Sequence, residues 1–105
     1  MYAAIRQYEM GAGFVSDLMR LLDEGFADTL SRLPGFAGYH AIASGTDEIV
    51  TVTVFRDEDS VVRSNELAAD FVRERLGDFE LNLTSQMSGE VGVSRMEPAL
   101  QAQHG

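Results

Sequence analysis

The chain has 105 residues, no cysteine and a net charge of −9, from 17 acidic and 8 basic side chains. This length predicts one domain, and the lack of cysteine excludes disulfides, thiolate nucleophiles and zinc–thiolate sites. An acidic surface repels phosphate groups, so we expect neither nucleic acid nor an anionic membrane as a partner. Because no segment resembles a signal peptide or a membrane span of about 20 apolar residues, we expect a cytoplasmic protein.

The first predicted elements are a short strand and an amphipathic helix. Residues 2–8 read as the strand, and the glycines at 11–13 end it. From residue 14 to residue 33, apolar side chains recur at helical spacing with charged side chains between them, which predicts one helix. Gly25 within this helix costs about 1 kcal/mol relative to alanine, so we expect close packing against a neighbour there. The Pro-Gly pair at 34–35 ends the helix.

The next two strands are predicted to form an antiparallel hairpin. They span residues 36–43 and 49–55, and the short connection between them contains glycine and aspartate. In the second strand, one face carries three valines and the other carries two threonines and Phe55. We expect the valine face to lie under the helices. The half-polar threonine face fits a barrel interior or a subunit interface better.

The remaining elements are a second helix and a last strand. Acidic residues 57–59 suit the start of the helix, because they can cap free N–H groups and complement the helix dipole. We expect this helix to run to Leu76, just before a glycine. Residues 78–88 predict an irregular connection, and residues 90–96 predict the last strand.

The element order, strand–helix–strand–strand–helix–strand, predicts an α+β fold of the ferredoxin-like type, with an antiparallel sheet. The predicted domain covers residues 1–97, and residues 98–105 read as a C-terminal tail. The two helices would cover one face of the sheet and leave the other face open. Because an uncovered half-apolar face is unfavourable in water, we expect a homodimer in which a second copy covers it.

Three polar residues stand out within the predicted elements. Asn65 falls in the apolar stripe of the second helix; it either points into a pocket between helix and sheet or bonds to nearby backbone. His40, in the middle of a strand, is either a proton carrier near neutral pH or a surface or interface residue. Arg6 shares a strand face with Tyr2 and Tyr8. Arg6 and the two tyrosines either hold an anionic or phenolic ligand or contact an acidic residue across a dimer interface. We favour the interface.

No two His, Asp or Glu residues stand at a spacing that specifies a metal site, so no metal is predicted. The glycines at 11–13 lack the lysine of a phosphate-binding loop and are too few for a dinucleotide fingerprint. The scattered methionines are better explained as core filling than as ligands.

Three segments, together with the strand order, resemble the antibiotic-biosynthesis-monooxygenase-like family of dimeric α+β barrels. They are LPGFAGYH (33–40), VTVFRDEDSV (52–61) and GEVGVSRM (89–96). The resemblance implies that two open sheets pair into a barrel with the helices outside. Some members of that family oxidise quinols or polyketide-like aromatics with molecular oxygen and no cofactor. Others degrade haem, and many have no assigned activity.

The functional residues of that family carry over only in part. Many active members have a tryptophan at the end of the third strand, where this chain has Phe55 and Arg56. They place a histidine on the second helix where Asn65 stands, and often another where Asp70 precedes Phe71. The haem-degrading members use the helix histidine as their iron ligand. Since asparagine cannot replace imidazole in that role, we do not expect haem degradation.

These observations favour a cofactor-free monooxygenase that acts on a small electron-rich aromatic, such as a quinol or a polyketide-like compound. Such chemistry needs chiefly a dry pocket that favours the deprotonated substrate. The alternative is a non-catalytic small-molecule-binding or stress-related protein on the same dimeric barrel; an interaction module without a pocket is a third reading. The oxygenase hypothesis assigns catalysis to His40 and Asn65, and substrate binding to Arg6, Tyr8, Phe55 and Phe71.

Overall fold

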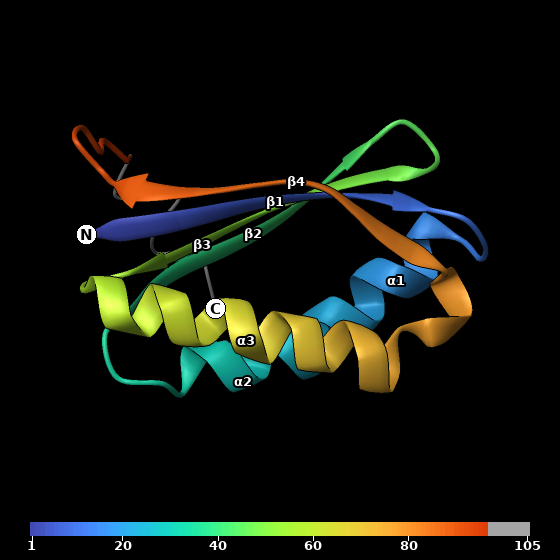
Figure 1. The fold of residues 1–105 in the computed structure, drawn as a ribbon, viewed down its shortest axis with the longest axis horizontal. Helices are drawn as coiled ribbons and strands as arrows, with labels where there is room; N and C mark the ends of the chain where they lie inside the picture. Colours follow the sequence, from blue (N-terminus) through green and yellow to red (C-terminus); the bar gives the residue numbers. More distant parts are fainter. Residues whose placement is uncertain (97–105) are drawn as a thin grey trace.

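A four-stranded antiparallel sheet with a layer of helices on one face makes up the computed structural model, which describes residues 1–96 (Figure 1). The predicted ferredoxin-like α+β fold is confirmed. In chain order the elements are β1 (Tyr2–Met10), α1 (Val15–Leu21), the π-helical turn η1 (Leu22–Ala27), α2 (Asp28–Ser31), β2 (Phe36–Ser44), β3 (Glu48–Phe55), α3 (Glu58–Arg75), the 3₁₀ turn η2 (Gly77–Phe79) and β4 (Leu81–Glu90). The tail predicted at residues 98–105 lies outside the described residues, so that boundary stays a prediction.

The strand order is β2-β3-β1-β4, which makes β1 and β3 central and leaves β2 and β4 at the edges. Directly opposite residues of antiparallel strands project from the same face of a sheet. The register therefore groups the side chains: Arg6 of β1 lies opposite Thr51 of β3, and Tyr39 of β2 lies opposite Thr53. All four belong to the face that the helices cover.

The predicted orientation of β3 is wrong. Thr51 and Thr53 lie under the helices with 5% and 0% of their surface exposed, whereas the three valines point to the open face and are half-buried. Side chains alternate along a strand, so the two threonines share a face with Ile49 and Phe55, which are 1% and 0% exposed. Burying this larger pair against the helices outweighs the burial of the valines, because a one-residue slip would expose both.

The last strand also differs from the prediction. The observed strand is β4, Leu81–Glu90. Residues 91–96, where the strand was predicted, form neither helix nor strand. At the end of β4, the Val91 N–H donates a hydrogen bond to the Met1 carbonyl. β4 pairs with β1 along its length, with one irregularity beside Gln7 and Tyr8. An edge strand with mostly exposed polar side chains has no apolar alternation to reveal it.

The first helix is one continuous stretch in which α1 passes through η1 into α2. A Cβ atom on Gly25, in η1, would lie 2.8 Å from the ring of Phe71 on α3. The expected close packing at Gly25 is therefore confirmed, and it brings the two helical segments together. The predicted cap of α3 is also confirmed: the Asp57 carboxylate accepts a 2.8 Å hydrogen bond from the Ser60 N–H, which lowers the pKa of Asp57.

The hydrophobic core lies between the sheet and the helices. Its buried side chains from the first helical stretch are Leu18, Leu22, Phe26 and Leu30, and those from α3 and its end are Val61, Ala68 and Leu76. Within residues 1–96, no helix is long and apolar enough to cross a membrane.

Candidate functional site

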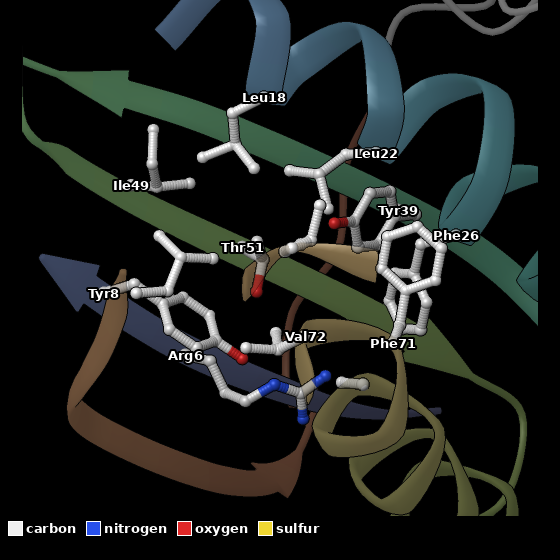
Figure 2. Close-up of a pocket in the computed structure, with 13 residues that line it drawn as sticks. Arg6, Tyr8, Leu18, Leu22, Phe26, Tyr39, Ile49, Thr51, Phe71 and Val72 are labelled. Atoms are coloured by element: carbon white, nitrogen blue, oxygen red, sulfur yellow. The ribbon is translucent and has the colours of Figure 1, made fainter. Parts of the chain in front are cut away.

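A small pocket opens inside this core, between α1 and η1, α3 and the covered face of the sheet (Figure 2). Four polar side chains line it, Arg6, Tyr8, Tyr39 and Thr51, and the rest of its wall is apolar. Its free volume, measured as the space open to the centre of a water molecule, is about 20 Å³. That space holds about one water. A larger guest therefore enters only when side chains of the wall move.

Arg6 is the most unusual residue of the pocket. It is 3% exposed, and its Nη1 donates a hydrogen bond to the Oδ1 of Asn65 on α3. No acidic residue lines the pocket, and within residues 1–96 the ion pairs involve other arginines. A buried charge without a counterion costs several kcal/mol unless something else stabilises it. Because Arg6 and Tyr8 face the helices, the dimer-interface interpretation of these residues is wrong.

Tyr39 supplies a second polar group that the sequence reasoning missed. Its ring packs edge-to-face against Phe26, with 5.5 Å between ring centroids, and its hydroxyl is buried. Burial raises the pKa of the Tyr39 phenol; the charge of Arg6 opposes this shift and Tyr8 adds to it. Tyr39 therefore keeps its proton at physiological pH. Its position opposite Thr53 in the hairpin was the available signal, but only once the buried face of β3 was known.

The predicted catalytic pair is not brought together. Asn65 contacts Arg6 beside the pocket, whereas His40 lies opposite Val52 on the other face of the sheet and is exposed. His40 lines a different and wider groove along the outer edge of β2, with a free volume of about 740 Å³. Neighbouring residues of a strand point to opposite faces, so His40 does not reach the pocket that Arg6 lines. A catalytic role for His40 in this pocket is therefore wrong.

Of the four predicted substrate-binding residues, three line the pocket and one does not. Tyr8 and Phe71 line the pocket together with Arg6. Phe55 does not: it is 0% exposed in the core and packs edge-to-face against Phe36, with ring centroids 5.7 Å apart. Its large ring therefore holds the end of β3 against the neighbouring strand instead of contacting a ligand.

Phe71 closes the pocket on the side of η1. Its half-buried ring lies against Gly25 and 5.5 Å from the ring of Phe26, and the Arg75 guanidinium carbon lies 5.5 Å from the Phe71 centroid. The ring thus forms the part of the pocket wall next to Phe26, where movement of this one side chain would enlarge the space (Figure 2).

The pocket does not fit a haem group. Its free volume is far below what a porphyrin needs, and no histidine lines it. Asn65, which stands where the haem-degrading members of the resembling family carry histidine, is engaged by Arg6. Among residues 1–96, no group of three or more His, Asp or Glu side chains could hold a metal ion.

No protein-family model and no curated protein matches the chain. Solved structures do match it. A protein from Chloroflexus aurantiacus J-10-fl, described as an antibiotic biosynthesis monooxygenase, has a TM-score of 0.67 and 21% identity over 91% of this chain and 98% of its own. A dimeric ferredoxin-like protein from an uncultured marine organism has a TM-score of 0.66 and 13% identity over 91% and 98%.

A third similar structure is SnoaB, a cofactor-independent oxygenase from Streptomyces nogalater. It has a TM-score of 0.60 and 16% identity over 92% of this chain and 96% of its own. At identities this low, the likeness concerns the fold. The chain has the ferredoxin-like α+β fold of the dimeric α+β barrel proteins, and it resembles in structure the antibiotic-biosynthesis-monooxygenase-like proteins among them.

Proposed function

We propose that the chain is a small cofactor-free oxygenase whose pocket binds an electron-rich aromatic compound in its deprotonated form. The observation that carries the proposal is Arg6, a buried cation whose hydrogen-bond partner is a neutral amide in an otherwise apolar pocket. An anionic oxygen of the ligand would provide the missing negative charge. The fold shared with SnoaB supports the proposal by analogy.

The chemistry needs no resident cofactor, because a deprotonated aromatic such as an anthrone can itself donate electrons to molecular oxygen. The reacting CH₂ group becomes a carbonyl, one oxygen atom of O₂ enters the product, and the other leaves as water with the two hydrogens. In this scheme Arg6 stabilises the substrate anion in a site of low polarity, where such an interaction is strong. Asn65 is a positioning residue that holds the guanidinium by accepting its Nη1–H.

The test is oxygen uptake with anthrone and with hydroquinones as substrates. The wild-type protein should consume one O₂ per anthrone, and Arg6→Met, which keeps the length of the side chain and removes its charge, should lower kcat/KM at least a hundredfold. Arg20→Met is the matched control, because Arg20 is exposed on α1, pairs with Asp17 and Glu24 there and does not line the pocket. Wild-type protein without uptake on any of these compounds would contradict the oxygenase proposal.

A non-catalytic binding protein is the second candidate. Active members of the resembling family carry a tryptophan and a histidine where this chain has Phe55 and Asn65. The loss of both favours binding without catalysis, since Phe55 belongs to the core here and Asn65 bonds to Arg6. A ligand that binds only the folded protein raises the melting temperature in proportion to its concentration over Kd. A rise with hydroquinones or anthrone, in the absence of oxygen uptake, would establish binding without turnover.

The open face of the sheet supports a homodimer as part of the same proposal. Ile5, Ile42 and Met87 are 38%, 49% and 61% exposed there. The register places Ile5 between Val52 and Met87, so the patch is continuous across three strands. A similar solved structure is a dimeric ferredoxin-like protein. Native mass spectrometry should give a dimer at micromolar concentration, and a clean monomer would contradict this part of the proposal.

A further inference from the structure

Two hydrogen-bonding groups of the pocket have no partner among residues 1–96: the hydroxyl of Tyr39 and the Nε–H of Arg6. Both atoms are buried. Leaving one such group unpaired costs about 1–3 kcal/mol, and the great majority of buried polar groups in native proteins are bonded. A third unpartnered group, the Thr53 hydroxyl, does not line the pocket. The two that do line it point to a shared partner.

The chemistry of the two groups defines that partner. The Nε–H of arginine can only donate a hydrogen bond, and the raised pKa of Tyr39 keeps a proton on its hydroxyl, so it donates as well. Arg6 lies on β1 opposite Thr51 of β3, and Tyr39 lies on β2 opposite Thr53, two residues farther along β3. Figure 2 shows the Tyr39 hydroxyl pointing into the pocket and the Arg6 guanidinium at another part of its wall. The ligand atom that suits two hydrogen-bond donors and a positive charge is an oxygen that carries negative charge.

We propose that Tyr39 and Arg6 together form a two-donor site for one oxygen anion of the ligand, which is therefore an aromatic compound with an ionised hydroxyl group. The inference rests on the proposed function and adds Tyr39 as the specificity-determining residue. Water satisfies the donors when no ligand is bound. An aromatic compound without the oxygen anion would displace that water and leave both donors unpaired, which is how a polar site rejects an analogue.

The experiment uses 4-nitrophenol, because only its ionised form absorbs visible light, so one titration reports both binding and ionisation. Wild-type protein should bind the phenolate and lower the pKa of the bound compound. Tyr39→Phe keeps the ring against Phe26 and removes only the hydroxyl. It should weaken binding of the phenolate ten- to a hundredfold, as expected for a hydrogen bond to a charged group, and raise the pKa of the bound compound by one to two units.

Two controls separate hydrogen bonding from packing. Nitrobenzene, which lacks the hydroxyl, should bind Tyr39→Phe at least as tightly as wild type, because the variant has no hydroxyl to leave unpaired; an equal loss for both ligands would reduce Tyr39 to a packing role and overturn the inference. Tyr2→Phe removes a tyrosine hydroxyl that does not line the pocket and should leave phenolate binding unchanged.

A measurement on the wild-type protein keeps the inference testable if Tyr39→Phe does not fold. In 4-nitroanisole the same oxygen carries a methyl group and no charge, so it should bind ten- to a hundredfold more weakly than the phenolate. Equal binding of the two would overturn the inference.

The outcomes also distinguish the inference from the function on which it rests. If Arg6→Met loses the phenolate while Tyr39→Phe keeps both the affinity and the pKa of the bound compound, Tyr39 is not part of the site and the proposed function stands. If wild-type protein consumes oxygen with anthrone but does not bind 4-nitrophenolate, the inference falls and the proposed function stands; if it does neither, both fall.

Discussion

The two faces of the sheet show an unexpected division of side chains. The face that the helices cover carries Arg6, Thr51 and Thr53, all at most 5% exposed. The open face carries three valines with Ile5, Ile42 and Met87, which are half-buried or exposed in the single chain. The valines of β3 are more hydrophobic than its threonines, yet the threonines are the buried residues. The proposed ligand would account for the polar groups under the helices, and the proposed homodimer would account for the apolar open face.

The largest effect is expected on the open face. Val52 lies opposite both Ile5 and His40, at the centre of this face. Val52→Glu would bury an unpaired charge between two sheets, so the dissociation constant of the dimer should rise at least a hundredfold, on the order of 3 kcal/mol. Sedimentation equilibrium measures this change. Val62→Glu is the control, because Val62 is 51% exposed on α3 and should leave the dimer intact. A Val52→Glu protein that associates as tightly as wild type would show that the open face is not the interface.

A smaller effect is expected on the covered face, where Gly25 meets Phe71. The Cβ atom of Gly25→Ala would lie 2.8 Å from the Phe71 ring and force it to move. Overpacking costs about 1–3 kcal/mol, and the better helix propensity of alanine returns about 1 kcal/mol, so the free energy of unfolding should fall by up to about 2 kcal/mol. Urea unfolding measures it. Gly38→Ala on β2, where a Cβ atom meets nothing within 4 Å, is the control. Equal stability of the two variants would contradict tight closure of the pocket by Phe71.

The smallest expected effect is a pH dependence of the free energy of unfolding that arises from Tyr39 on the covered face. The pKa of Tyr39 is raised in the folded protein, chiefly by burial, and is about 10 in the unfolded chain. The folded protein therefore holds this proton more tightly, so the contribution of Tyr39 to stability is complete below about pH 10 and is lost as the pH rises further. The loss is at most about 1.4 kcal/mol per pH unit for one group.

The check is the free energy of unfolding of wild type and Tyr39→Phe, each measured on both sides of about pH 10. Wild type should lose more stability than the variant as the pH rises. Parallel curves would show that the Tyr39 hydroxyl is not buried as in the structure.

Local patterns predicted much of the fold. The helical periodicity of residues 14–33 and the acidic start of α3 correspond to elements of the structure, because such patterns depend on neighbours within one or two turns. The sequence did not reveal β4, since its side chains are mostly exposed and an edge strand is held by backbone pairing to β1. The orientation of β3 was mistaken because three valines seemed more suited to burial than Thr51 and Thr53.

The candidate site was predictable only in pieces. Arg6, Tyr8, Asn65 and Phe71 were singled out, and the structure places all four at or beside one pocket. Which face of the sheet a strand residue occupies could not be settled from the chain alone. The structure therefore removed His40 and Phe55 from the pocket, and added Tyr39, which stands next to His40 in the sequence and on the opposite face.

The amino-acid sequence by itself determined the order of the elements, the start of α3 at its Asp57 cap and the presence of a polar residue, Asn65, in the apolar stripe of α3. Only the tertiary structure decided which polar groups meet. The Arg6–Asn65 hydrogen bond joins residues 59 positions apart, and Tyr39 reaches the same pocket through the register of a third strand. Periodicity arises from contacts between near neighbours, whereas the site arises from strand register and from the packing of helices on one face. Those long-range choices are made by the burial of Ile49 and Phe55, which turns the threonine face of β3 toward the helices.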